Sequence, residues 1–169
     1  MYAFSVRELF RFPNPVNEVS ARLVAAGVVG MCLAIVVLDQ PWLVAVLAYG
    51  FVARVLTGPT LSPLGQLVTR VVTPRVPVPA KLVPGPPKRF AQGVGATLSV
   101  TAAVLHFGFG ATGAAEVLVG MIAVAATLES VFAFCLGCTM FGWLMKAGIV
   151  PERACVECAD IWSRARTAA

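Results

Sequence analysis

The sequence contains few charged residues and a single histidine. Asp, Glu, Lys and Arg make up only 12% of its 169 residues, while 59% are hydrophobic. A soluble domain of this size would have too few polar side chains to cover its surface. His106 has no second histidine with which to share a haem or a metal ion. Together with a mean hydropathy of +0.86, this composition excludes a soluble globular domain and indicates a membrane protein.

The basic residues form no stripe and no known nucleic-acid-binding motif, although the net charge is +5 and the pI is near 9.3. They are scattered between the apolar stretches, where attraction to the anionic lipids of an inner leaflet explains them better. We therefore expect the lipid bilayer as a partner and no nucleic acid.

The apolar stretches predict an all-α integral membrane protein with four transmembrane helices. A helix needs about 20 apolar residues to cross a hydrocarbon core about 30 Å thick. The chain has room for four such helices, short links and one longer loop, which leaves no separate soluble domain. We therefore predict a single membrane domain over residues 1–169. Its predicted parts are transmembrane helices over about 19–38, 41–57, 90–109 and 114–134, a loop over 58–89 and a cysteine-containing tail over 135–169.

Two segments outside the transmembrane helices predict amphipathic helices at the membrane interface. Residues 1–12 mix Phe, Leu and Val with Arg and Glu, and they lack the compact apolar segment of a signal peptide. In the proline-rich loop, apolar residues recur at helical spacing between Ser62 and Pro74. Ahead of the first transmembrane helix, we expect Asn14 to cap a helix that has Pro15 at its first position.

Lysine and arginine mark one side of the membrane. They occur near the start of the first transmembrane helix, at the end of the second, in the loop and after the fourth, whereas the two short turns on the other side carry none. The positive-inside rule then places both termini, the loop and the tail in the cytoplasm. We expect a multi-pass protein of a bacterial inner (cytoplasmic) membrane, and we leave a homo-oligomer open.

Four of the five cysteines form two pairs, Cys135-x-x-Cys138 and Cys155-x-x-Cys158. They are the only cluster of side chains in the sequence that could carry out redox exchange or bind a metal ion. Residues 149–155 can cover roughly 23 Å when extended, so the second pair can reach back to the first after a turn. We therefore predict that the four sulfur atoms meet at the cytoplasmic face.

The last apolar stretch is too long for one crossing of the membrane. From Ala114 to Ala147 it would form a helix of about 50 Å, which exceeds the hydrocarbon core by several turns. A bend is therefore expected, with Gly137 and Gly142 as the kink points. This bend would leave the first cysteine pair at the inner membrane surface.

The spacing C-x2-C-x16-C-x2-C supports two functions. In a thiol-disulfide or sulfur relay, one pair accepts electrons or sulfane sulfur from a soluble partner and passes them to the other pair by thiolate attack. In a non-enzymatic membrane scaffold, the same four thiolates hold a structural zinc ion. Neither pair is followed by the glycine common in zinc ribbons, which favours the relay. Unreactive thiols are a third interpretation, and a small channel or transporter is disfavoured because the helices hold few polar groups.

Two ionisable residues lie at matching depth in the predicted transmembrane helices. Arg54 and Glu129 are each about 20 Å from the outer surface when the helices are measured from their outer ends. We expect them to form an intramembrane ion pair that holds two helices together. The alternatives are a proton-carrying role for the carboxylate and an Arg54 side chain that extends to the inner surface.

The segments FPNPVNEVSAR (residues 12–22) and VPGPPKRFAQ (residues 83–92), together with the paired C-x-x-C motifs, resemble an uncharacterised family of small four-span bacterial membrane proteins common in actinobacteria. The likeness runs from Phe12 to Cys158. It implies a thioredoxin-like or sulfurtransferase protein as the partner. It assigns no catalytic residue, so whether the chain is an enzyme stays open.

Overall fold

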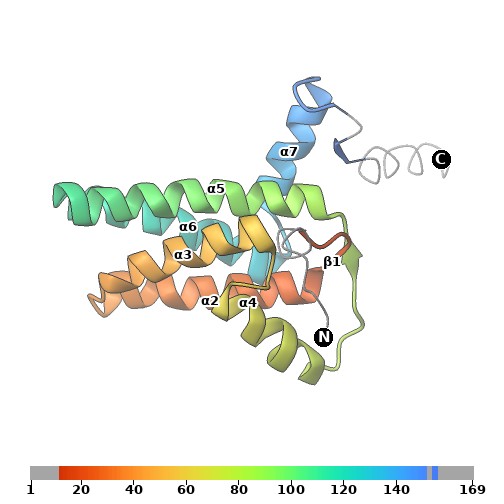
Figure 1. Ribbon diagram of the computed structural model, residues 1–169, viewed down its shortest axis with the longest axis horizontal. Helices are drawn as coiled ribbons and strands as arrows, with labels where there is room; N and C mark the ends of the chain where they lie inside the picture. Colours follow the sequence, from red (N-terminus) through yellow and green to blue (C-terminus); the bar gives the residue numbers. More distant parts are fainter. Residues whose placement is uncertain (1–11, 152–153, 156–169) are drawn as a thin grey trace, which may run out of the picture.

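The computed structural model describes residues 12–151 and 154–155. Within them, four apolar helices lie side by side (Figure 1). They are α2 (Glu18–Val37), α3 (Trp42–Thr57), α5 (Gly85–Ala103), which continues as the π-helix η3 (Val104–Gly108), and α6 (Thr112–Phe132). Helix α2 packs against α3 and α6, and α5 packs against the same two helices, so the four form a closed bundle.

The interior of the bundle is filled by small and branched apolar side chains. Leu47, Val44 and Val119 are almost completely buried, and so is Cys32. Many other apolar side chains lie instead on the outer surface, among them Val37, Val117 and Phe132. An apolar exterior around an apolar core is the arrangement expected for a protein whose solvent is lipid.

The helices fall close to the segments predicted from the sequence. Within the described residues, three helices are long and apolar enough to cross a membrane, namely Glu18–Val37, Gly85–Gly108 and Thr112–Phe132. The helix Trp42–Thr57 is apolar but shorter, with 16 residues. These findings confirm a helical fold with three helices, among the described residues, that could cross a membrane.

Helix α6 ends in a break before the cysteine pair. Ala133 adopts a left-handed backbone conformation with φ of 56°, and a new helix, α7 (Leu136–Lys146), begins three residues later. The predicted bend is therefore present, but it lies at Ala133 and not at Gly137 or Gly142. Both glycines lie within α7, which leaves the bundle at a steep angle (Figure 1).

An arginine from α2 satisfies the open end of α6. The guanidinium of Arg22 donates hydrogen bonds to the carbonyl oxygen of Ser130, at 3.1 and 3.0 Å, and to that of Val131 at 3.1 Å. The last carbonyls of a helix have no partner within the helix and carry partial negative charge. Arg22 therefore supplies partners for the last carbonyls of α6 at the point where the chain leaves this helix and starts α7.

The FPNP segment does not begin the first helix. Instead, β1 (Val16–Asn17) pairs antiparallel with β2 (Leu82–Val83), and α2 starts at Glu18. The N-cap is Asn17, whose side-chain oxygen accepts from the backbone N–H of Val19 at 3.0 Å. The predicted capping role of Asn14 was therefore wrong, since its side-chain oxygen accepts from the backbone N–H of Gly85 at 2.8 Å.

The helix predicted between Ser62 and Pro74 is confirmed. It consists of α4 (Pro63–Leu67), the π-helical η1 (Val68–Val72) and one 3-10 turn, η2 (Thr73–Arg75). The hydroxyl of Ser62 caps it by accepting from the backbone N–H of Gly65 at 3.2 Å. The amphipathic helix predicted at the N-terminus falls almost wholly on residues 1–11, which lie outside the described residues.

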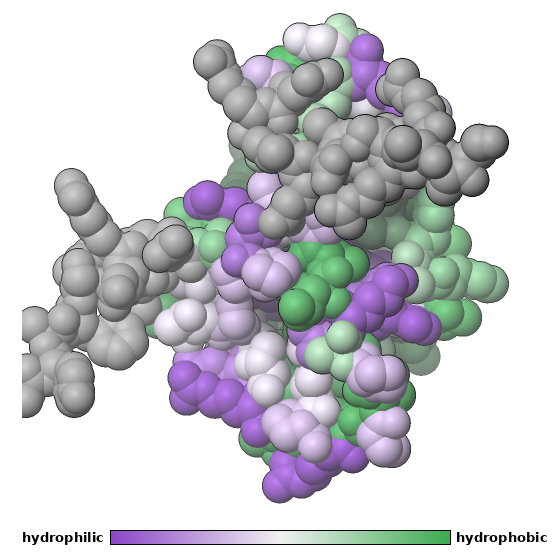
Figure 2. Space-filling model, turned by 90° about the vertical axis from the view of Figure 1, so that its right-hand side faces the viewer, coloured by the Kyte–Doolittle hydropathy of each residue, from purple (hydrophilic) through white to green (hydrophobic). Residues whose placement is uncertain are grey.

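The polar parts of the chain gather at one end of the bundle. Helices α2 and α5 begin there, α3 and α6 end there, and β1 and α7 lie at the same end (Figure 1). Figure 2 looks onto this end and shows hydrophilic residues spread over its described part. The short turns at the opposite end contain no Lys or Arg. This end of the bundle holds the candidate site.

Candidate thiol site

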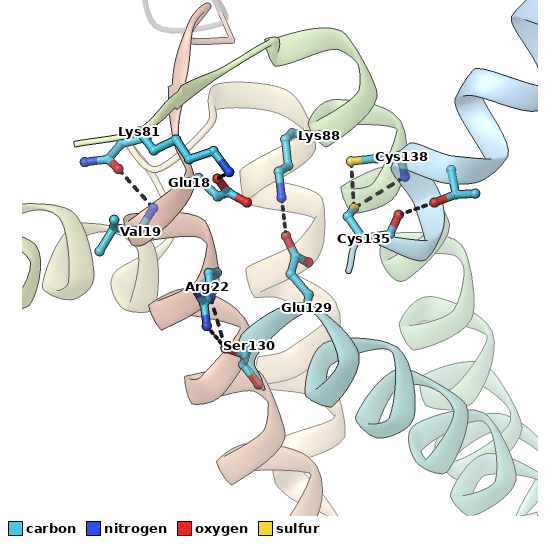
Figure 3. Close-up of polar contacts among 11 residues, drawn as sticks. Glu18, Val19, Arg22, Lys81, Lys88, Glu129, Ser130, Cys135 and Cys138 are labelled. Atoms are coloured by element: carbon cyan, nitrogen blue, oxygen red, sulfur yellow. Dashed lines mark hydrogen bonds and ion pairs between the residues drawn. The ribbon is translucent and has the colours of Figure 1, made fainter. Parts of the chain in front are cut away.

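The first cysteine pair lies at the start of α7. Cys135 is the N-cap, and its sulfur accepts a hydrogen bond from the backbone N–H of Cys138 at 3.3 Å. The thiol of Cys138 also donates to the Cys135 sulfur, with the two sulfur atoms 2.7 Å apart (Figure 3). The Thr139 hydroxyl donates to the carbonyl oxygen of Cys135 at 3.2 Å. The two sulfur atoms are thus held together by the first turn of the helix.

The two thiols differ in acidity because of this geometry. The hydrogen bond from Cys138 lowers the pKa of Cys135, and the nearby Lys88 ammonium lowers it further, against opposing effects of burial and of Glu129. The same hydrogen bond raises the pKa of Cys138, since that thiol must give up its donated proton in order to ionise. Thiolates are the reactive form of cysteine. Cys135 is therefore the more acidic of the two thiols, and Cys138 holds its proton more tightly.

A buried ion pair stands next to the sulfur atoms. The ammonium of Lys88, in the first turn of α5, lies 2.5 Å from a carboxylate oxygen of Glu129, near the end of α6 (Figure 3). Both side chains are largely buried, with 11% and 16% of their surfaces exposed. The dithiol therefore faces one fixed positive and one fixed negative charge.

The two segments that carry the family resemblance meet and position Lys88. The ammonium of Lys81 pairs with the carboxylate of Glu18 at 2.8 Å, and the backbone N–H of Glu18 donates to the Lys81 carbonyl oxygen at 2.8 Å. Any side chain on Gly85 would meet the Pro13 carbonyl oxygen at 2.6 Å, so only glycine fits there. The segment around residues 12–18 thus fixes where α5 begins, and with it the place of Lys88.

A cleft of about 550 Å³ gives access to the dithiol. Both cysteines are half-buried, which leaves their sulfur atoms shielded but reachable. Helix α7 is held beside α5 by the rings of Phe90 and Phe141, whose centres are 5.7 Å apart. The polar or aromatic side chains that line the cleft are Glu18, Lys88, Phe134, Cys135, Cys138, Thr139, Phe141, Trp143 and Lys146.

Of the second cysteine pair, only Cys155 lies within the described residues. Cys155 is buried and disulfide-bonded, whereas Cys32, Cys135 and Cys138 are free thiols. Cys158 lies outside the described residues. In the described part of the chain, no three His, Cys, Asp or Glu side chains lie close enough to hold a metal ion. The structure therefore offers no ligand set for zinc there.

The structure gives Arg54 and Glu129 different partners from the predicted ones. Glu129 pairs with Lys88, while the Nε of Arg54 donates to Gln92 at 2.9 Å and its Nη1 donates to Ser62 at 3.2 Å. Arg54 and Glu129 do line one cavity. Position along a helix says nothing about which way each side chain points around it, so the ion pair between Arg54 and Glu129 was not a safe inference from their matching depth.

Sequence reasoning missed Lys88 and Gln92. In the sequence, Lys88 indicates only the cytoplasmic side of the membrane, because the third transmembrane helix is expected to begin at Phe90. One signal was available: the two polar residues are four positions apart at the start of an apolar helix, and so lie on one face of it. That spacing is typical of side chains that act in one site.

Comparison with known proteins identifies a family. Residues 16–146 match the family described as Domain of unknown function (DUF4395), and the chain belongs to this family. The matched region contains the first cysteine pair, Lys88 and Glu129, and it ends before the second cysteine pair. No curated protein and no solved structure matches the chain significantly.

Proposed function

We propose that this DUF4395 protein is a membrane thiol-disulfide exchange protein whose reacting group is the Cys135–Cys138 dithiol. The observation that carries the proposal is the hydrogen bond from the Cys138 thiol to the Cys135 sulfur at the start of α7. Thiol-disulfide exchange requires one cysteine that attacks and a neighbour that resolves the mixed disulfide. The unequal acidity of the two thiols supplies these two roles.

The exchange proceeds in two steps with a soluble thioredoxin-like or sulfurtransferase partner. The Cys135 thiolate attacks a partner disulfide, a mixed disulfide forms, and one partner sulfur leaves as a thiolate that takes up a proton. Cys138 then loses its proton and attacks the Cys135 sulfur, which releases the second partner thiol. Two electrons thereby pass to the partner, and a Cys135–Cys138 disulfide remains. The reverse sequence carries electrons from a partner dithiol into the protein, and a partner persulfide would pass its outer sulfur to the same thiolate.

We propose further that α3 also crosses the membrane, giving four transmembrane helices. Its 16 residues span about 24 Å, a little less than the hydrocarbon core, and bilayers adapt to such a mismatch at modest cost. The Lys and Arg distribution supports a bacterial inner membrane with both termini in the cytoplasm. The dithiol would then face the reducing compartment, where soluble thiol proteins are abundant.

We assign the second pair, Cys155 and Cys158, to the same relay, as a second dithiol that exchanges electrons with Cys135–Cys138. The disulfide at Cys155 supports a redox role for this pair.

The proposal is tested by redox titration of the purified full-length protein in lipid nanodiscs. The protein is equilibrated with glutathione buffers, and the Cys135–Cys138 peptide is quantified by alkylation and mass spectrometry. We expect one reversible two-electron transition that is lost in Cys135→Ser and Cys138→Ser and kept in Cys32→Ser. With oxidised thioredoxin, Cys138→Ser should accumulate a mixed disulfide and Cys135→Ser should not. Thiols that stay reduced in every buffer while one equivalent of zinc co-purifies would overturn the proposal in favour of a scaffold.

A further inference from the structure

A second cavity lies beside the dithiol, inside the helix bundle. Its volume is about 250 Å³, and Cys135 is part of its wall. Apolar side chains from α2, α5 and α6 form most of the lining, and the exposed residues Met121 and Met140 lie at its edge. The cavity therefore reaches from the reactive sulfur to the apolar outer surface of the molecule. The apolar lining includes Val24, Val28, Leu98, Ile122, Ala125 and Ala126.

Arg54, which lines this cavity, has one hydrogen-bond donor without an acceptor. Its side chain is only 4% exposed, and its Nη2 has no hydrogen-bond partner among the described residues, although Gln92, Ser62 and the Phe51 ring hold the rest of the guanidinium in place. A buried charged donor that stays unpaired destabilises the fold, because it has lost its hydrogen bonds to water without gaining others. Arg54 also borders a neighbouring cavity of about 210 Å³, but only the first cavity includes Cys135 as well. A ligand in that cavity would have both the donor and the thiol within its walls.

The chemistry of these walls selects one class of ligand. The apolar edge admits a lipid-soluble molecule. A carbonyl oxygen of that molecule would accept a hydrogen bond from Arg54. An anionic headgroup is disfavoured, because Glu129 lines the same cavity. We propose that the cavity binds the ring of an isoprenoid quinone, which exchanges two electrons with Cys135 and Cys138. This inference rests on the proposed function, because it names the membrane partner of the same dithiol.

The reaction balances with two thiols and one quinone. The Cys135 thiolate adds to a ring carbon and forms a carbon–sulfur bond. Cys138 then gives up its proton and attacks the Cys135 sulfur, so that the disulfide forms while the carbon–sulfur bond breaks. The electron pair of that bond stays on the ring, which takes up the two protons released by the thiols and leaves as the quinol. Electrons from a soluble dithiol would thus reach the membrane quinone pool.

The test uses the reduced full-length protein in nanodiscs and a ubiquinone with a single isoprene unit. Quinol formation is followed by ultraviolet absorbance, and the disulfide by mass spectrometry. We expect one quinol per Cys135–Cys138 disulfide. In Ala125→Phe, which fills the cavity from a partly exposed position, the rate at low quinone concentration should fall at least tenfold. In Val124→Phe, on the exposed face of the same helix, it should stay at the wild-type value.

Quinone binding to Cys135→Ser, measured by equilibrium dialysis, separates this inference from the proposed function. Binding that is weakened by Ala125→Phe supports the cavity site whether or not the dithiol exchanges with soluble disulfides. If the dithiol cycles with thioredoxin but the quinone neither binds nor oxidises it, the quinone site is wrong and the exchange function stands. Equal quinone rates in Ala125→Phe and the wild type would likewise overturn the site.

Discussion

Two cysteines three positions apart acquire different chemistry because only one of them is a helix cap. Cys135 receives both the backbone N–H and the thiol of Cys138, so negative charge on its sulfur is stabilised by two donors. Cys138 receives neither. The positive end of the helix dipole favours the same thiolate. The direction of attack in any exchange reaction follows from this asymmetry.

Lys88 should set the pH at which Cys135 becomes reactive. Because its positive charge lowers the pKa of Cys135, Lys88→Met should shift the alkylation profile of Cys135 to higher pH and slow its alkylation at neutral pH several-fold. The measurement is the rate of iodoacetamide labelling of Cys135 against pH, by mass spectrometry. Arg89→Met is the matched control, because Arg89 is exposed and donates to the Val55 carbonyl oxygen. A profile that moves equally in both variants would remove Lys88 from the site.

At this scale the sequence predicted the types of reactive residue better than their partners. The spacing of Cys135 and Cys138 identified the dithiol without any structure. The partner of Glu129 was missed, because Lys88 enters the bundle only when α5 starts at Gly85. That start depends on the contact of Gly85 with Asn14, which is 71 residues away in the chain. A contact of such range leaves no local pattern.

At the scale of elements, the position of α7 depends on one close approach to α5. A Cβ atom on Gly137 would lie 2.5 Å from the Ala91 Cα, so the two helices touch backbone to backbone at this point. Glycine is needed there for space and not for flexibility, although the sequence suggested a kink. The kink lies at Ala133, where the Arg22 guanidinium donates to the Ser130 carbonyl oxygen at the end of α6.

Gly137→Ala should therefore push α7 away from α5. We expect a loss of about 1–3 kcal/mol in stability, as for other overpacked contacts, and slower disulfide formation between Cys135 and Cys138. Gly142→Ala, in the same helix, meets nothing within 4 Å and should be neutral or stabilise by up to about 1 kcal/mol. Thermal unfolding in detergent, followed by circular dichroism, compares the two. Similar unfolding temperatures for both variants would contradict the close approach.

At the scale of the whole molecule, the distribution of charge was enough to predict one polar end and one apolar end. The approximate positions of the apolar helices also followed from hydropathy, because a membrane-sized apolar segment has few alternative structures, although α5 begins at Gly85 and not at the expected Phe90. The pairing of helices did not follow. Which face of α2 meets α6 depends on side-chain shape, and a helix that is apolar on all sides gives no periodic signal.

The orientation of the bundle is tested with two introduced cysteines in a background without native cysteines. Gln40→Cys lies in the turn between α2 and α3, and Arg75→Cys lies at the end of η2, on the opposite side of the predicted membrane. We expect an impermeant maleimide to label Gln40→Cys in intact spheroplasts and Arg75→Cys only after lysis. The reverse pattern would place the dithiol outside the cytoplasm and change the class of its soluble partner.

One face of α5 contacts both the surroundings of the dithiol and the wall of the cavity. Lys88 holds Glu129 beside the sulfur atoms, and Gln92, one turn along α5, holds Arg54 at the cavity. A rotation of α5 would therefore change the Lys88–Glu129 contact and the Gln92–Arg54 contact together. Occupation of the cavity would alter the reduction potential of the dithiol, and oxidation of the dithiol would alter cavity affinity by the same factor. The first turns of α5 would thus couple ligand binding from the membrane to the redox state of the soluble thiol proteins.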